Sequence, residues 1–194
     1  MKTWILPLLA ASTLLAAQAH ATVLGFDDLD ANGKLSSLAT RAGAYGTLTW
    51  DKNWYLGDIA VAGYGSAAHS GRNYVNNGFG VNNLVVSSSE AFDFAGAWFA
   101  APTINGTQAT SVNISAYDAA NNLIGSTGNV AITNSFLYIA AGFDGVSRLV
   151  VTRDKGFFVM DDFTLADAEV PEPAGVFVLG LGLVGLVARR RRFA

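Results

Sequence analysis

Hydrophobic and polar positions alternate in the middle of the chain, as they do in a half-buried strand. In residues 111–117, Val112, Ile114 and Ala116 fall on one face and the polar side chains fall on the other. This period of two is typical of strands, and no long stretch between the two ends shows the 3.6-residue period of an amphipathic helix. Further strands are predicted at 23–29, 47–55, 84–88, 92–100, 129–133, 136–140, 148–152 and 157–165.

Turn-forming pairs of residues separate these predicted strands. Asparagine followed by glycine occurs at positions 32, 77 and 105, and aspartate followed by glycine occurs at position 144. Short strands at this spacing, with turn signals between them, predict an all-β domain. The fold class we expect is a two-sheet antiparallel β-sandwich of the jelly-roll type, with a closed barrel as the alternative.

Two largely apolar segments lie outside this pattern, and the first is close to the N-terminus. It runs through residues 4–17, follows Lys2 and ends at Ala19-His20-Ala21. A basic start, an apolar run and small residues three positions and one position before the cut are the parts of a secretory signal peptide. We therefore expect residues 1–21 to form a signal helix that is removed by cleavage after Ala21.

The second apolar segment, residues 174–188, contains no charged side chain and is followed by Arg189, Arg190, Arg191 and Arg192. Clustered arginines stay cytoplasmic, so this pattern predicts a transmembrane helix at 174–188 and a cytoplasmic end at 189–194. At about 1.5 Å per residue, 15 residues are shorter than a hydrocarbon core of about 30 Å. Such a short helix suits a temporary anchor in the inner membrane.

The order of motifs at this end resembles a known sorting signal. Val170-Pro171-Glu172-Pro173 precedes the apolar segment, which contains Gly180, Gly182 and Gly185, and the arginines close it. Together they resemble the PEP-CTERM sorting tail of Gram-negative bacteria, a tail also found on some ice-binding proteins. The resemblance implies that exosortase, a membrane transpeptidase, recognises this tail and processes the chain near the motif Pro171, Glu172 and Pro173. The protein would then pass from the inner membrane to the outer surface or the extracellular matrix.

Removing both signals leaves residues 22–169 as a single expected domain. This span contains seven basic and fourteen acidic residues, a formal charge of −7. An acidic surface disfavours nucleic acid and anionic lipid as partners, because both need a basic stripe to neutralise phosphates. The chain has no cysteine, which excludes a disulfide framework, a thiolate nucleophile and a lipoprotein anchor.

Loose motifs spread through this span carry a second resemblance. The motifs of this span resemble those of the body domain that is common in exosortase-sorted proteins. That body domain is in turn similar to carbohydrate-binding jelly rolls in the sequence of its first and last strands. The resemblance implies a surface or matrix protein associated with exopolysaccharide or biofilm, and it supports the fold more than any ligand. The motifs are Phe26-Asp27-Asp28-Leu29, Gly46-Thr47-Leu48-Thr49-Trp50, Asn77-Gly78-Phe79-Gly80, Phe92-Asp93-Phe94 and Phe158-Val159-Met160-Asp161-Asp162-Phe163.

Acid pairs at the two ends of the domain are the most informative polar residues. On a regular last strand, Asp161 would share a face with the apolar residues 157, 159, 163 and 165. A buried carboxylate needs a cation, a cluster of backbone N–H groups or an arginine. If the first and last strands pair, Asp27 or Asp28 would lie beside Asp161 or Asp162.

Four carboxylates in one place would suit calcium, which prefers oxygen ligands. We therefore predict a structural Ca²⁺ site at Asp27, Asp28, Asp161 and Asp162, the one cofactor that the sequence suggests. The alternative is that the outward acids are solvated and that the inward one bonds to a loop.

Aromatic residues form the second candidate site. Trp50, Trp54, Tyr64 and Tyr74 are predicted to hold a glycan, with Tyr55 and Trp98 in the same group and Asp58, Asn76 and Asn77 nearby. The C–H patches of sugars stack on aromatic rings, and amide or carboxylate groups then bind the hydroxyls. The alternative is that these rings, several of which lie in strands, belong to the core.

Catalytic signals are weak, so the protein is not expected to be an enzyme. His20 leaves with the signal peptide, which makes His69 the single imidazole of the mature domain. The nucleophile motif G-x-S-x-G is absent, and Glu90 is the only glutamate before Glu169. The leading hypothesis is a non-catalytic surface or matrix protein. A specific carbohydrate-binding module is the alternative, and a hydrolase of envelope polysaccharide is the third.

Overall fold

The structure is a computed structural model that describes residues 21–103 and 106–166. The predicted signal helix with Ala19, the Pro-Glu-Pro motif, the apolar segment 174–188 and the arginine cluster lie outside the described residues. Within the described part of the chain, no helix has the length and apolar character needed to cross a membrane.

The described residues form strands with very little helix, which confirms the all-β prediction. The strands are β1 (Thr22–Leu24), β2 (Ser36–Ser37), β3 (Ala44–Tyr45), β4 (Leu48–Trp50), β5 (Trp54–Asp58), β6 (Asn73–Asn77), β7 (Leu84–Ala100), β8 (Ser111–Tyr117), β9 (Leu123–Ser126), β10 (Val130–Ala131), β11 (Leu137–Arg153) and β12 (Val159–Ala166). The helices are α1 (Leu38–Ala42) and the 3₁₀ turn η1 (Gly78–Gly80).

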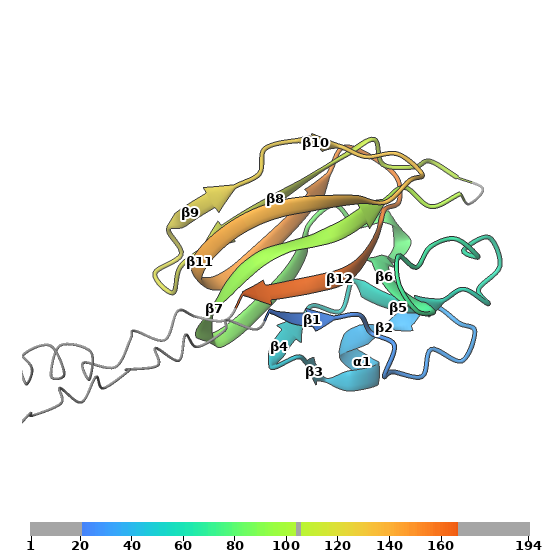
Figure 1. Cartoon of the computed structure of the whole chain (residues 1–194), viewed down its shortest axis with the longest axis horizontal. Coiled ribbons are helices and arrows are strands. Elements are labelled where there is room, and N and C mark those ends of the chain that lie inside the picture. Colours follow the sequence, from blue (N-terminus) through green and yellow to red (C-terminus); the bar gives the residue numbers. More distant parts are fainter. Residues whose placement is uncertain (1–20, 104–105, 167–194) are drawn as a thin grey trace, which may run out of the picture.

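The two long strands, β7 and β11, run through both layers of the β-sandwich (Figure 1). The first part of β7, residues 84–87, pairs with residues 148–151 of β11, and β8 extends this layer beyond β11. The last part of β7 pairs with β12, and β6, β5 and β2 continue the second layer. The register of β11 against β7 shifts between Ala140 and Arg148, where irregular pairing allows a strand to bend.

The separate strands predicted at 84–88 and 92–100 are therefore two parts of one strand, as are those at 136–140 and 148–152. The sequence pattern breaks at residues 89–91 because these side chains are exposed, yet β7 remains one strand there. Sequence analysis also missed strand β6 and helix α1. The five residues of β6 are all buried, so they show no alternation of polar and apolar positions.

Trp50 lies at the centre of the core between the layers. Its ring meets Phe26, Trp54 and Phe163 edge-on, with centroid distances of 5.5, 5.5 and 5.3 Å. The indole N–H of Trp54 donates to the carbonyl oxygen of Val85 at 3.1 Å. Because Trp54 lies in one layer and Val85 in the other, this bond ties the layers together through the core.

The last strand changes face in its middle, which the sequence analysis did not anticipate. Met160 and Phe163 both point into the main core, although they are an odd number of residues apart. The register against β7 shifts between Asp161 and Thr164, and Asp162 has a positive φ of 48°. The prediction that Asp161 shares a face with Phe163 is therefore wrong.

A loop, residues 59–72, covers the outer face of the second layer beside β6, β7 and β12. Tyr64 and Ala67 of this loop pack with Tyr74, Ala100 and Val159 in a second apolar cluster. Tyr64 stacks on Tyr74 with a centroid distance of 5.3 Å and an angle of 10° between the rings. The outer face of this layer is therefore built from strand residues and from the loop above them.

The first and last strands pair. Thr22 faces Leu165 and Leu24 faces Phe163 in the antiparallel pair of β1 and β12. The chain thus enters and leaves the domain on neighbouring strands at one edge of the sandwich (Figure 1).

The two tryptophans Trp50 and Trp98 should differ in their contribution to stability. We expect Trp50→Ala to lower the free energy of unfolding by about 3–5 kcal/mol, because it leaves a cavity among three rings. Trp98→Ala should cost about 1 kcal/mol, because Trp98 points out of the sandwich and is partly exposed. Chemical denaturation of the two variants measures both values, and equal losses would contradict this packing.

Candidate functional site

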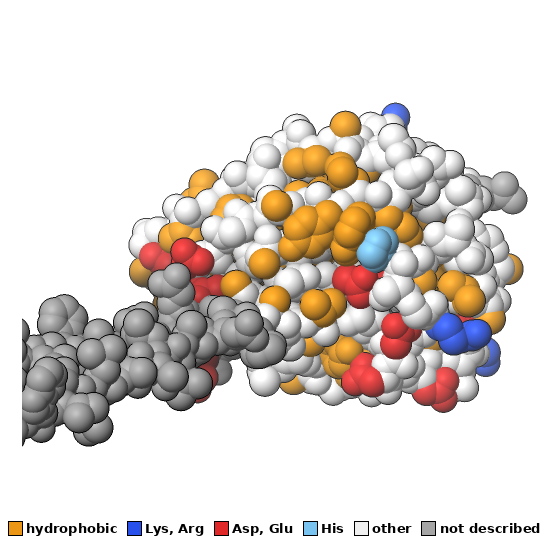
Figure 2. Space-filling model, viewed as in Figure 1, with side chains coloured by type: hydrophobic (Ala, Val, Ile, Leu, Met, Phe, Trp, Pro, Cys, Tyr) orange, Lys and Arg blue, Asp and Glu red, His pale blue; other side chains and the backbone are white. Residues whose placement is uncertain are grey.

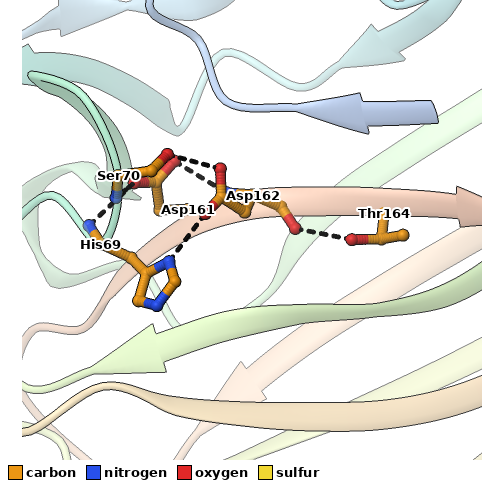
Figure 3. A network of polar contacts seen from close by, with 5 residues as sticks. All are labelled: His69, Ser70, Asp161, Asp162 and Thr164. Atoms are coloured by element: carbon orange, nitrogen blue, oxygen red, sulfur yellow. Dashed lines mark hydrogen bonds and ion pairs between the residues drawn. The ribbon is translucent and has the colours of Figure 1, made fainter. Parts of the chain in front are cut away.

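A buried carboxylate attaches the loop 59–72 to the sandwich. Asp161 is 0% exposed, and one of its oxygens accepts hydrogen bonds from the backbone N–H groups of His69 at 2.8 Å and Ser70 at 3.0 Å. Its other oxygen accepts from the N–H of Asp162 at 2.7 Å. A cluster of backbone N–H groups was one of the three partners expected for this side chain (Figure 3).

Burial raises the pKa of Asp161 to about 7, mainly because desolvation penalises the charged carboxylate. The nearby charge of Asp162 raises the pKa further, whereas the N–H groups of Ser70, Asp162 and His69 lower it. The loop is therefore held by a carboxyl group whose charge changes near neutral pH.

The neighbouring Asp162 points toward the side chains of the same loop. One of its oxygens lies 2.7 Å from Nδ1 of His69, and the other accepts a hydrogen bond from the hydroxyl of Ser70 at 2.7 Å. The left-handed backbone of Asp162 directs consecutive carboxylates to different partners. Figure 3 shows both acids meeting the loop at His69 and Ser70.

Asp27 is brought to the same region by the pairing of β1 with β12. A Cβ atom added to Gly25 would lie 3.1 Å from an Asp162 oxygen and 3.7 Å from an Asp27 oxygen. Asp27 also accepts hydrogen bonds from the N–H groups of Arg72 at 2.7 Å and Asn73 at 2.9 Å. Asp27 and Asp162 therefore both lie close to Gly25.

Asp28 lies on the rim of a shallow polar hollow of about 610 Å³ that Asp27, Ser70 and Asp162 also line. Its carboxylate accepts a hydrogen bond from the hydroxyl of Tyr45 at 2.6 Å. Burial and this bond raise the pKa of Tyr45. The hollow therefore has an acidic rim with hydroxyl groups beside it.

Over residues 21–103 and 106–166, no three His, Asp or Glu side chains come close enough together to hold a metal ion. The oxygens of Asp161, Asp162 and Asp27 have hydrogen-bond partners in the loop instead. The calcium site at the four aspartates stays a prediction.

Four aromatic side chains gather next to this acidic group, and we call them the aromatic face: His69, Trp98, Phe136 and Tyr138. Trp98 of β7 lies in register with Asp161 on one side and with Tyr138 on the other. The His69 ring stacks on Trp98, with centroids 3.8 Å apart and an angle of 12° between the rings. In Figure 2, hydrophobic side chains lie beside the pale blue histidine of this face, and an acidic side chain lies just below it.

Close packing around Trp98 holds the remaining rings. Tyr138 lies 5.5 Å from Trp98 and Phe136 lies 5.4 Å from His69, measured between ring centroids. A side chain at Gly96 would meet the Tyr138 ring at 2.8 Å. Glycine at this position therefore allows the tyrosine ring to lie against the sheet.

The structure corrects the predicted sugar platform. Trp50, Trp54, Tyr64 and Tyr74 are between 0 and 6% exposed, so these four rings do not form an exposed platform on which a sugar could stack. Apolar rings in strands are driven into the core by the hydrophobic effect, which was the alternative. Of the aromatic group named from the sequence, Trp98 belongs to the aromatic face.

Sequence reasoning missed Phe136, Tyr138 and His69 as site residues. The alternation of residues 136–140 contained a signal, because it places Phe136, Tyr138 and Ala140 on one face of a strand. It did not show which face is outward.

Residues 169–192 match the family model of the PEP-CTERM protein-sorting motif. The chain carries a PEP-CTERM sorting tail. It is therefore an exported surface protein that exosortase processes at the cell envelope. No curated protein matches this sequence.

Solved structures with similar folds are distant from this chain. The tandem CBM22-1-CBM22-2 domain of Paenibacillus barcinonensis Xyn10C is 11% identical, with 84% of this chain and 50% of that chain covered and a TM-score of 0.44. This chain thus spans about half the length of that tandem protein.

Two further structures cover more of their own length. The K2 cleaved adhesin domain of Lys-gingipain is 11% identical, with 75% of this chain and 99% of that chain covered and a TM-score of 0.43. A DUF4465 family protein from Bacteroides caccae is 13% identical, with 76% and 86% covered and a TM-score of 0.42. At TM-scores below 0.5, these likenesses carry no inference about a ligand.

The raised pKa of Asp161 leads to a pH-dependence of stability. Between the ordinary value of 3.8 and about 7, the folded state binds more protons than the unfolded chain. The free energy of unfolding should therefore rise as pH falls through this window, by about 1–3 kcal/mol between pH 7.5 and 5. This contribution is lost as pH rises through 7.

Asp161→Asn keeps an acceptor for the loop N–H groups but cannot titrate. We therefore expect it to remove this pH-dependent part of the free energy of unfolding. Denaturation at a series of pH values measures the slope. Asp144→Asn, an exposed aspartate in a different region, serves as the control and should keep the wild-type slope. An unchanged slope in Asp161→Asn would contradict the assignment.

Proposed function

We propose that this protein is a non-catalytic component of the outer surface or extracellular matrix that associates with exopolysaccharide through its aromatic face. The observation that carries the proposal is the partly exposed row of Trp98 and Tyr138, with His69 and Phe136 beside it. Asp162 lies at the edge of this row.

Aromatic rings and carboxylates together can contact both the apolar faces and the hydroxyl groups of a sugar. The C–H patches of a sugar ring pack against aromatic faces, and its hydroxyl groups donate hydrogen bonds to carboxylate oxygens. The Asp162 side chain is 15% exposed, and the His69 side chain is 29% exposed. Both remain accessible for polar contacts at the rim.

The charge around the aromatic face favours neutral polysaccharides. Asp27, Asp28 and Asp162 lie on the adjoining hollow, and residues 22–169 carry a formal charge of −7. An anionic chain such as a polyuronate would be repelled by this field.

The geometry of the polar group does not favour catalysis. A serine nucleophile requires a histidine that accepts its proton, but the Ser70 hydroxyl donates to Asp162. His69 bonds the same carboxylate through Nδ1. Asp161, the carboxyl with the raised pKa, is buried beneath the loop, so a substrate cannot reach it. The hydrolase hypothesis therefore ranks third.

Binding to polysaccharides tests the proposal directly. Using the processed protein, we expect measurable association with neutral polysaccharides that falls at least tenfold in Trp98→Ala and Tyr138→Ala, or about 1.4 kcal/mol. Tyr117→Ala changes a partly exposed ring on β8 in the other layer and should bind like the wild type. Isothermal titration against a panel of neutral and acidic polysaccharides provides the measurement.

The outcomes separate the remaining hypotheses. Broad association with neutral polysaccharides supports the matrix role, whereas one sharply preferred glycan supports a specific carbohydrate-binding module. Flat binding curves across the panel, or equal binding by Trp98→Ala and wild type, would overturn the proposed role of the aromatic face.

Processing at both ends sets the mature chain. We propose a product that begins at Thr22 and ends near Pro173, released from its inner-membrane intermediate onto the surface of a Gram-negative cell. The intact mass of the protein from the cell surface or the medium should match this span, beside a larger cell-bound precursor. A surface product that still contains residues 174–194 would contradict exosortase processing.

A further inference from the structure

A second cavity lies on the outer face of the second layer of the sandwich. We call it the Asn76 pocket, after one of its lining residues. The Asn76 pocket has a volume of about 270 Å³. Its lining residues are Leu35, Tyr55, Tyr64, Asn76, Gly78, Phe79 and Phe157. None of them is charged, and four of them are aromatic.

Asn76 places an unpaired amide in this pocket. The residue is 1% exposed, and neither Nδ2 nor Oδ1 has a hydrogen-bond partner among the described residues. Leaving a buried donor and a buried acceptor unpaired is costly and uncommon in folded proteins. A role in binding would account for an amide kept in this position.

The other two buried asparagines of β6 differ from Asn76. The Nδ2 group of Asn73 donates to the carbonyl oxygens of Phe26 and Leu29, both at 2.7 Å. The side chain of Asn77 donates to Gly156 at 2.9 Å and accepts from the N–H of Phe158 at 2.9 Å. Strand β6 therefore uses two asparagines to hold the fold and leaves the third unpaired.

The position of Asn76 in the sheet directs its side chain to the pocket side. Asn76 lies in register with Tyr55 on β5 and with Val159 on β12. Val159 belongs to the outer apolar cluster with Tyr64, and Tyr64 and Tyr55 both line the pocket. The amide and these rings therefore share the outer face of the layer.

Phe79 forms an exposed aromatic wall. It is 85% exposed, and its φ of 54° is unfavourable for a residue with a bulky side chain. Its ring meets Tyr55 edge-on at 5.3 Å. Gly78 allows this arrangement, because a Cβ atom there would lie 2.0 Å from the Tyr55 ring.

We infer that the Asn76 pocket binds one uncharged sugar ring. An amide with one free donor and one free acceptor matches two neighbouring hydroxyl groups, and Phe79 provides a face for the C–H side of the ring. A carboxylate or phosphate would find no cation in the lining. The volume lies just below the usual range for drug-sized ligands, which suits a single ring.

This inference rests on the proposed association with polysaccharide and adds a second contact for it. The aromatic face and the Asn76 pocket lie in the same layer, with the loop 59–72 contributing His69 to one and Tyr64 to the other. A polysaccharide could thus be held along its length at the aromatic face and by one sugar unit in the pocket.

The test uses the processed protein and methyl glycosides of glucose, galactose, mannose and xylose, with methyl glucuronide as the anionic control. Ligand-observed NMR titration measures binding. We expect at least one neutral glycoside to bind and methyl glucuronide not to bind. Affinity should fall at least tenfold in Asn76→Leu and in Phe79→Ala, and it should be unchanged in Tyr117→Ala, which changes a partly exposed ring on β8 in the other layer.

Thermal unfolding of Asn76→Leu provides a second measurement. Leucine has a similar volume and removes the two unpaired polar atoms, so Tm should rise by about 2–6 °C while binding is lost. A structural amide satisfied by a bridging water would instead give a lower Tm and unchanged glycoside binding.

The result that overturns the inference is the absence of glycoside binding in the wild type, or wild-type affinity in both pocket variants. Failure of the proposed function has a different signature. In that case, polymers would not bind to the aromatic face, while the response of glycosides to Asn76→Leu and Phe79→Ala would be retained.

Discussion

The buried carboxylate of Asp161 is the constraint on which the outer face of the molecule depends. A carboxylate removed from water must be hydrogen-bonded, and here the backbone N–H groups of His69 and Ser70 meet that need. Those bonds hold the loop 59–72 across the second layer. The same loop places His69 on Trp98 and Tyr64 beside the Asn76 pocket.

The irregular end of β12 joins this site to the core. The register shift after Asp161 returns Phe163 to the interior, where it packs against Trp50 and Phe94, and it leaves Asp162 free to bond the loop side chains. One local irregularity thus completes the core and forms the polar group beside the aromatic face. Strained backbone at such positions is common where a protein builds a functional surface.

Much of the fold was predictable, because burial leaves a local trace in the sequence. The alternation at residues 111–117 identified β8, and the strands around 84–100 and 137–153 were found in parts. The candidate site was less predictable. Of the four rings first assigned to sugar binding, Trp50 and Trp54 belong to the main core and Tyr64 and Tyr74 to the outer apolar cluster. Apolar size alone does not show which side of a sheet is covered. Likewise, the asparagines of β6 look alike in sequence but have different hydrogen-bonding partners.

The sequence by itself determined the all-β class and the sorting tail, because periodicity, small residues and charge clusters act over short stretches of chain. Tertiary structure alone decided which carboxylate is buried, which rings are exposed and which amide is unpaired. These properties arise from contacts between distant residues: Asp161 bonds Ser70 across 91 positions of the chain. A shift of one residue in β12 exchanges the faces of all the residues that follow, and this shift comes from pairing and packing rather than from local pattern.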